Sequence, residues 1–297
     1  MKNYLGLIYA LSAYLWWGIL PIFWKNLDHV PSLEIVTHRV IWACVIVFLI
    51  ILLMREWSTF IALFKQKRIL LQSIAASVLM TINWGVFIWA VTNQRIVETS
   101  LGYFINPLAT VLFGMLFFGE TLSKYQAAAL LIAALGVAVM VFANGEVPII
   151  SLALAITFAS YSVVKKKMSV SASHGLAIET LLMMIPAVIF LIYLESQGQN
   201  SFGGDIKTDV MLIMGGLVTL VPLLLFAAAV SKMSMTALGM TQYIGPICQL
   251  FIAVLIYNEP FGQERQLAFG LIWLALVVYS VDQLNAQRLR RIERRKA

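Results

Sequence analysis

Long apolar stretches fill this chain, and short polar connections separate them. Within each stretch the apolar residues are continuous and do not alternate with polar ones, which favours membrane-spanning helices over the strands of a membrane barrel. A helix needs about 20 such residues to cross the hydrocarbon of a bilayer. Ten stretches meet this requirement, at about 4–24, 33–53, 70–91, 97–118, 125–143, 148–165, 175–194, 210–230, 235–257 and 266–284. The pattern therefore predicts an all-α polytopic membrane protein with ten transmembrane helices.

The composition agrees with this interpretation. Apolar residues make up 61% of the 297 residues and charged residues only 12%, whereas soluble proteins carry about 45–50% and about 25%. These values exclude a soluble globule, a disordered chain and a nucleic-acid-binding protein. Cys44 and Cys248 lie inside apolar stretches and are expected to be packing residues. We expect no metal and no cofactor, because the three histidines are far apart and lie in no Cys/His ligand spacing.

The distribution of Lys and Arg predicts the orientation. If the N-terminus is cytoplasmic, sixteen of the 21 cations lie on the inner side, four on the outer side, and Arg39 lies within a span. We therefore expect both termini in the cytoplasm of a bacterial inner membrane. The basic segment 287–297 is interpreted as a cytoplasmic tail that contacts anionic lipid, rather than as a nucleic-acid patch. The first apolar stretch lacks a small-residue cleavage site and is not expected to be a signal peptide.

Two halves of the chain resemble one another. Pro107 and Glu120 recur 139 residues later as Pro246 and Glu259. With five spans in each half, the second half would enter the membrane with the opposite polarity, as in the inverted repeats of secondary transporters. We therefore predict repeats over 1–145 and 146–286, with a substrate site near the midplane where they meet.

Several segments resemble one transporter family. These are SAYLWWGILPIFWK (12–25), PSLEIVTHRVIWA (31–43), INWGVFIWAVTNQRIVETSLGYFINPL (82–108), GLAIETLLMMIPA (175–187) and LGMTQYIGP (238–246). They are similar to the RarD branch of the EamA-type permeases, in the drug/metabolite transporter superfamily. The resemblance implies a ten-helix inner-membrane exporter of two EamA repeats. The chloramphenicol-sensitivity label of that branch describes a phenotype and leaves the substrate open.

Three functions compete. No GxxxxGK[ST] loop is present, so the chain is not expected to hydrolyse ATP by itself. It is also not expected to be an enzyme, because its loops are short. The favoured hypothesis is a secondary transporter that exports amphipathic metabolites, amino acids or drugs such as chloramphenicol by alternating access, with protons or an exchanged solute as coupling partner. The alternatives are a non-transporting partner or receptor subunit and, less favoured because the loops are poor in Asp, a membrane-embedded lipid or isoprenoid transferase.

Ionisable residues inside the spans are the candidates for gating and coupling, because such residues are costly in a membrane. Arg39 and Glu179 occupy nearly equivalent places in the two halves, each close to a different membrane face. We therefore expect them to serve opposite gates and not to touch; the alternative is that both reach to their nearest interface. His38 could relay protons, although a packing histidine is the more common case.

Aromatic and amide residues in the middle of the spans are the candidates for a substrate cavity. They are Trp17, Asn83, Trp84, Tyr103, Asn106, Tyr161, Gln242 and Tyr243. The alternative is hydrogen bonding between helices for the amides and an interfacial belt for the aromatics. Trp24 and Trp57, near span ends, are expected to be belt residues.

Prolines within the spans are expected to break or kink their helices. The candidates are Pro107, Pro222 and Pro246. Glu120 and Glu259 are expected to cap or orient the short hairpins that follow their spans. Small residues at 129 and 133 indicate close helix contact, either within the chain or at the face of a homodimer.

Overall fold

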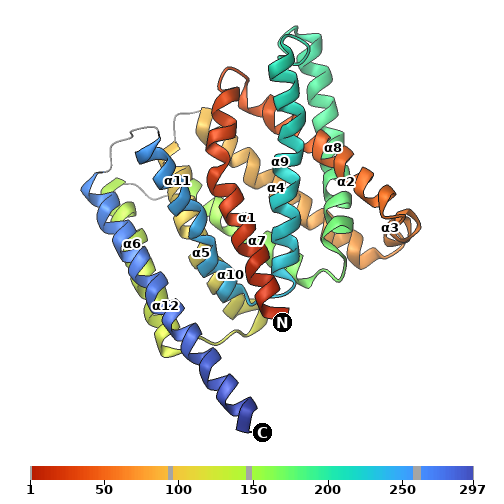
Figure 1. Ribbon diagram of the computed structural model, residues 1–297. Coiled ribbons are helices and arrows are strands. Elements are labelled where there is room, and N and C mark those ends of the chain that lie inside the picture. The colour runs from red at the N-terminus through yellow and green to blue at the C-terminus, as the bar shows by residue number, and fades with distance from the viewer. Residues whose placement is uncertain (1, 93–95, 145–148, 257–261, 297) are drawn as a thin grey trace.

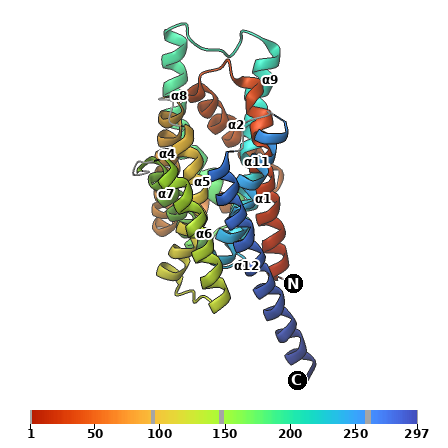
Figure 2. The ribbon, with the colours of Figure 1, turned by 90° about the vertical axis from the view of Figure 1, so that its left-hand side faces the viewer.

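The computed structural model describes residues 2–92, 96–144, 149–256 and 262–296, and this part of the chain is helical. Most helices run along one common axis, and the two termini lie at the same end of the bundle (Figure 1; Figure 2). The helices are α1 (Lys2–Trp24), α2 (Ser32–Leu53), α3 (Trp57–Leu63), α4 (Lys67–Thr92), α5 (Ile96–Phe118), α6 (Lys124–Asn144), α7 (Ile149–Lys167), α8 (Ala172–Ser196), α9 (Ile206–Val230), α10 (Met235–Gln242), α11 (Ile244–Leu255) and α12 (Gln263–Lys296), with a 3₁₀ turn, η1, at Lys25–Leu27.

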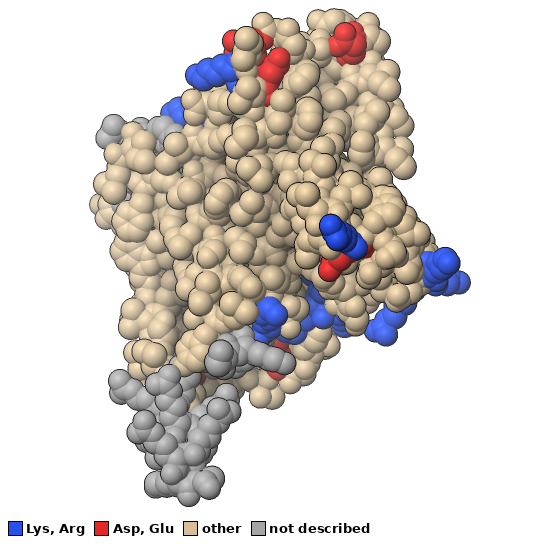
Figure 3. All heavy atoms as spheres, turned by 45° about the vertical axis from the view of Figure 1, so that its right-hand side comes forward, with Lys and Arg blue, Asp and Glu red and all other residues tan. Residues whose placement is uncertain are grey.

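The helices have the length and surface of membrane spans. Within the described residues, eight are long and apolar enough to cross a membrane, and α5 contains a shorter apolar stretch, Gly102–Phe118. Large apolar side chains face outward along the sides; Phe142 is 82% exposed and Leu116 is 74% exposed. On the face that Figure 3 shows, Lys, Arg, Asp and Glu lie mostly toward the two ends. The protein is therefore an all-helical, multi-pass membrane protein.

The sequence predicted a single helix over the apolar stretch 235–257, but the structure has two helices there. Helix α10 ends at Gln242 and α11 begins at Ile244. Pro246 has no backbone N–H to donate to the carbonyl of Gln242, so the helical hydrogen bonds are interrupted there. They resume with the N–H of Ile247, which donates to the carbonyl of Tyr243 at 3.2 Å. The break expected at Pro246 thus coincides with a real interruption.

Of the break or kink expected at Pro107 and Pro222, the structure shows no break. Both prolines lie inside unbroken helices, α5 and α9. A proline removes a single helical hydrogen bond, and neighbouring helices that pack on both sides hold the rest of the helix in place. Both rings are buried in such contacts.

The connection after α2 contains a short helix that the hydropathy pattern did not reveal. Helix α3 inserts Phe60, which is 1% exposed, against the end of α2. The rings of Phe48 and Phe60 meet edge to face, with centroids 5.3 Å apart. The helix is too short to be recognised from an apolar run, and its aromatic contacts hold it in place.

The helices of the first half (α1, α2, α4, α5 and α6) pack mainly against those of the second half (α7 to α12). Helix α1 packs against α9 and α11, and in the same way α7 packs against α4 and α5. Two further pairs, α2 with α8 and α6 with α12, join helices that hold equal places in the two halves. The two halves are therefore interleaved.

Glycine permits the closest of these contacts. A Cβ atom on Gly216 of α9 would lie 2.3 Å from the Cβ of Trp42 on α2, and one on Gly239 of α10 would lie 2.7 Å from the carbonyl oxygen of Pro107 on α5. Ala129 and Ala133 are fully buried in a cluster with residues of α12, so their close contact lies within the chain.

We expect Gly216→Val to destabilise the protein, because the α2 backbone would have to move away from α9. Overpacking of this kind costs about 1–3 kcal/mol. Gly85→Val is the matched control, since a Cβ on Gly85 meets no atom within 4 Å. The unfolding temperatures of the two variants, measured in detergent, check this. Equal unfolding temperatures would show that the α2–α9 contact relaxes freely.

Candidate functional site

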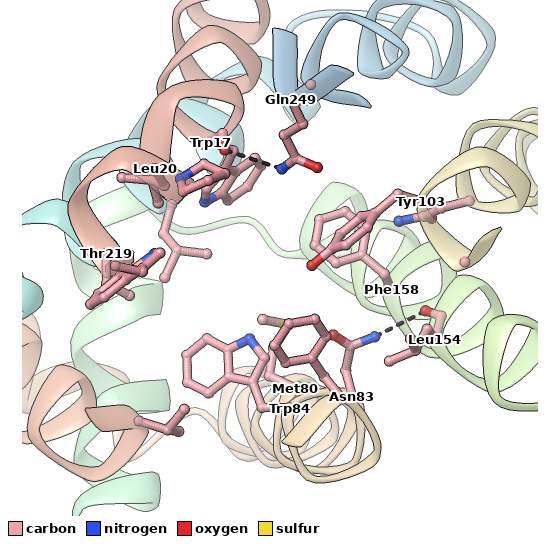
Figure 4. Close-up of a pocket in the computed structure, with 18 of the residues that line it drawn as sticks. Trp17, Leu20, Met80, Asn83, Trp84, Tyr103, Leu154, Phe158, Thr219 and Gln249 are labelled. Carbon is pink, nitrogen blue, oxygen red and sulfur yellow. Dashed lines mark hydrogen bonds between the residues drawn. The ribbon is translucent and has the colours of Figure 1, made fainter. Parts of the chain in front are cut away.

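A cavity of about 500 Å³ lies between the two halves. Helices of both halves contribute to its wall, and Figure 4 shows side chains from several of them converging on one space. Most of the wall is apolar or aromatic. Its aromatic and polar residues are Tyr14, Trp17, Trp24, Ser32, Arg39, Asn83, Trp84, Phe87, Tyr103, Asn106, Phe158, Thr219, Gln242 and Gln249.

The cavity occupies the half of the bundle that lies away from the termini. It takes its residues from the second half of α1 and of α4, and from the first turns of α2, beginning at Ser32. The opposite half is filled by a cluster of buried residues that includes Tyr161, Phe226 and Met235. The cavity thus lies toward the end of the bundle that is away from the termini.

Six of the eight predicted cavity residues line this space. They are Trp17, Asn83, Trp84, Tyr103, Asn106 and Gln242. Tyr161 and Tyr243 do not, and both are fully buried elsewhere, which corrects the prediction for these two. Successive helical residues point about 100° apart, so Tyr243 faces away when Gln242 faces the cavity. Tyr161 lies one turn beyond the lining residue Phe158, below the floor.

The amide side chains of the wall play two different roles. The Asn83 amide nitrogen donates to the carbonyl of Leu154 at 2.9 Å and to the hydroxyl of Thr157 at 2.8 Å, which fastens α4 to α7. Asn106 is also buried, but its side-chain oxygen has no hydrogen-bond partner in the part of the chain that the structure describes. Asn83 therefore serves the scaffold, whereas the side-chain oxygen of Asn106 is buried without a partner among the described residues.

Arg39 brings the only charge to the cavity wall, among the described residues. Its Nε donates to the hydroxyl of Thr219 at 2.8 Å. The guanidinium carbon lies 4.8 Å from the ring centre of Trp24 and 5.2 Å from that of Trp84. Trp24, expected to be an interfacial belt residue, thus contacts the arginine in the cavity. Cation–π contacts of this kind stabilise a desolvated guanidinium by about 2 kcal/mol.

Glu179 lies outside the cavity, buried on the closed side. Its Oε1 is 2.7 Å from Nζ of Lys165, and its Oε2 accepts a hydrogen bond from Tyr161 at 3.1 Å. The sequence placed Lys165 with the solvated loop cations, but it is only 7% exposed. The correction has a simple cause: the last turn of α7 packs into the bundle, and its ammonium group needs a buried partner.

Arg39 and Glu179 have different partners, as the sequence predicted. Arg39 lies on α2 and Glu179 lies on α8, and these two helices pack against each other. Even so, Arg39 is in the cavity, whereas Glu179 is paired beneath it. Their assignment to opposite gates remains a proposal.

His38 does not line the cavity. Its ring stacks on Phe202, with centroids 4.9 Å apart, and its Nδ1 accepts a hydrogen bond from the indole of Trp42 at 3.3 Å. The ring is 4% exposed. These contacts correspond to the packing histidine that the sequence left as the alternative to a proton relay.

Glu120 caps a helix of the other half. Its two carboxylate oxygens accept the backbone N–H groups of Met235 and Thr236, at 2.7 and 2.8 Å, at the start of α10. A carboxylate at this position also interacts favourably with the helix dipole. Glu120 therefore has the expected capping role, but it caps a helix of the opposite half and not the hairpin that follows α5. Glu259 lies outside the described residues.

Comparison with known proteins identifies the family. Residues 4–142 and 147–281 each match the EamA-like transporter family. The chain belongs to this family. Similar curated proteins include an "Uncharacterized transporter" of Vibrio cholerae (40% identical, covering 95% of this chain and 93% of that protein) and "Protein RarD" of Escherichia coli (39%, covering 95% and 96%). A "Chloramphenicol-sensitive protein RarD" of Pseudomonas aeruginosa is 31% identical, covering 98% and 97%.

A solved crystal structure shares the fold. It superposes on this EamA protein with a TM-score of 0.71, at 15% identity, and the match covers 94% of this chain and 98% of the other. Each EamA match spans one of the two interleaved sets of helices, so the cavity lies where the two EamA domains meet. The family consists of transporters, not enzymes.

Prediction from the sequence missed several site residues. Thr219 and Gln249 line the cavity from α9 and α11. Gln249, an amide in the middle of the stretch 235–257, carried the same signal as Gln242, whereas Thr219 is an ordinary polar residue in an apolar stretch. The only available signal for Lys165 was that it opens a run of three lysines at a span end, which is typical of a solvated loop. Helix packing, which hydropathy does not report, decides these positions.

Removing one member of the buried ion pair should destabilise the protein more than neutralising both. Lys165→Met leaves the Glu179 carboxylate buried without its cation, which costs about 3–5 kcal/mol. Adding Glu179→Gln should restore part of this stability. The unfolding temperatures of the two single variants and the double variant, measured in detergent, check it. If the two single effects simply add, the pair carries no coupling.

Proposed function

We propose that this EamA protein is a secondary transporter that exports small amphipathic solutes by alternating access between two inverted halves. The observation that carries the proposal is the cavity itself. It lies between the halves, and buried side chains of both halves, among them Ala76 and Phe226, fill the bundle toward the termini. A cavity of about 500 Å³ falls within the range of about 300–1,000 Å³ for small-molecule sites.

The pairing of the helices supports the inverted repeat. Each contact between the halves has a counterpart: α1 with α9 corresponds to α7 with α4, and α1 with α11 corresponds to α7 with α5. Five spans in each half then give ten crossings, with α10 and α11 together forming one of them. Two packings related by such symmetry are the basis of rocking mechanisms in transporters.

The closed end would act as the inner gate. Lys165 of α7 pairs with Glu179 of α8, and Glu120 of α5 caps α10 across the same end. We place the termini and most loop cations in the cytoplasm of a bacterial inner membrane, and the cavity would then face outward. Opening inward would separate these groups and expose Glu179 to water, where a proton or an exchanged solute could couple to the cycle.

Two cysteine reporters test alternating access, in a background with Cys44→Ala and Cys248→Ala. Ser32→Cys places a thiol in the cavity, and Ser73→Cys places one in a fully buried position on the closed side. A transported solute should change their labelling rates by a membrane-impermeant reagent in opposite directions. A protein in which no solute changes either rate would be a non-transporting partner or receptor subunit.

Flux in proteoliposomes tests the transport activity itself. We expect saturable movement of amphipathic solutes, with chloramphenicol and aromatic amino acids as the first probes because of the names of the RarD relatives and the aromatic wall. A pH gradient that drives this flux would establish proton coupling. Flux without dependence on the gradient would establish exchange or facilitated passage. Absence of flux for all of them would contradict the proposal.

We also expect Glu179→Gln to favour the inward-open state, because the uncharged amide holds Lys165 less strongly. The Ser73→Cys reporter should then be labelled faster, several-fold over the parent. Glu195→Gln, on an exposed turn of the same helix, is the matched control. An unchanged rate in Glu179→Gln would show that the ion pair does not keep the inner end closed.

A further inference from the structure

The charge of the cavity wall is not balanced. Within the described residues, no carboxylate lies within ion-pair distance of Arg39, and only its Nε has a hydrogen-bond partner, the hydroxyl of Thr219. The remaining four N–H groups, on the two terminal nitrogens, are left without an acceptor. Ionisable groups inside a membrane protein are normally paired, and an exception marks a functional site.

The acidic residue nearest to Arg39 on α2 is already engaged. Glu34 is fully buried, and its two carboxylate oxygens accept from the backbone N–H and the hydroxyl of Ser201, at 2.7 and 2.9 Å. Glu179, the near-equivalent of Arg39 in the other half, is paired with Lys165. Neither carboxylate can therefore neutralise the guanidinium.

Arg39 is also held in place rather than reaching to the membrane surface. Trp24 of α1 and Trp84 of α4 lie against its guanidinium, and Thr219 of α9 fixes its Nε. Gly215, one turn before Thr219, packs against the same two side chains: a Cβ there would lie at ordinary contact distance, 3.5 Å from the Trp24 ring and 3.6 Å from Cγ of Arg39. The cation is thus preorganised at the wall, with its terminal fork free.

We propose that Arg39 is the anion-binding residue of the cavity, and that the solute carries one carboxylate on an aromatic or otherwise apolar body. The terminal fork of a guanidinium matches the two oxygens of a carboxylate. A single cation balances one negative charge, whereas a phosphate monoester would bring close to two. The apolar body would contact the aromatic wall, including Trp17, Phe158 and Tyr103 (Figure 4).

The use of this site in transport rests on the function proposed above, but binding at the site does not. Calorimetry on the purified full-length protein can therefore test it without any flux. The probes are three pairs that differ only in charge: benzoate and benzamide, phenylacetate and phenylacetamide, 3-phenylpropionate and 3-phenylpropanamide. We expect at least one acid to bind about tenfold more tightly than its amide, as a charge-assisted bidentate hydrogen bond predicts.

The preference for the acid should depend on Arg39. In Arg39→Gln the acid and the amide should bind equally, whereas Arg39→Lys should keep part of the preference because it keeps the charge. Arg68→Gln, which removes an exposed arginine at the start of α4, is the matched control and should leave the preference unchanged. The comparison of acid with amide in the wild-type protein needs no variant, so misfolding of Arg39→Gln would not prevent the test.

Three results would overturn the inference: amides that bind as tightly as acids, no saturable binding of any acid, or an undiminished preference in a folded Arg39→Gln variant. Flux separates this inference from the proposed function. Selective binding of acids without movement of any solute would uphold the anion site and contradict transport. Movement of neutral solutes without binding of acids would uphold transport and contradict the anion site.

Discussion

The interleaving of the two halves is the constraint on which the rest of the structure depends. Each span of one half is packed against spans of the other, so neither half has an internal core of its own to which a site could be confined. Gly216 and Gly239 bring backbones from the two halves into direct contact, and Glu120 of the first half completes the hydrogen bonds of α10 in the second. A cavity in such a bundle lies between the halves, and in the transport cycle proposed above a shift of one half against the other would change which end of it is closed.

The cost of charge in a low-dielectric interior explains the two ionisable positions that the halves share. The buried charge of Glu179 is stabilised by a buried cation and a tyrosine hydroxyl, and these contacts contribute to the closed end. The charge of Arg39 is stabilised by two indole faces and one hydroxyl, and its terminal nitrogens remain available. Nearly equivalent places in the two halves thus carry opposite charges with different surroundings: Glu179 is paired with a cation, and Arg39 lies at the cavity wall.

Hydropathy predicted the spans and the two halves because the bilayer imposes a length and a polarity on each helix independently of its neighbours. Six of the eight residues predicted to line the cavity do line it, since polar groups in the middle of a span have few other places to lie. Hydropathy failed where the packing between helices decides which way a side chain faces. Gln242 and Tyr243 are adjacent and were equally plausible as cavity residues. Only the rotation of the helix at this point decides which of the two faces the cavity. Lys165 had the appearance of a loop cation, and Trp24 that of a belt residue, until the folded bundle gave each a charged partner.

The polar groups of the cavity divide into those that hold the fold and those that remain free. The amide nitrogen of Asn83 donates its hydrogen bonds to α7, and the amide oxygen of Gln242 accepts one from the hydroxyl of Thr110 at 3.4 Å. Asn106 keeps an unpaired oxygen, and Arg39 keeps its terminal fork. A site with broad aromatic walls and so few free polar groups discriminates by charge and by apolar area, and only weakly by detailed shape. In the proposed transporter such a wall would accept many bodies of similar size, and the guanidinium would be the feature that restricts the class of solute.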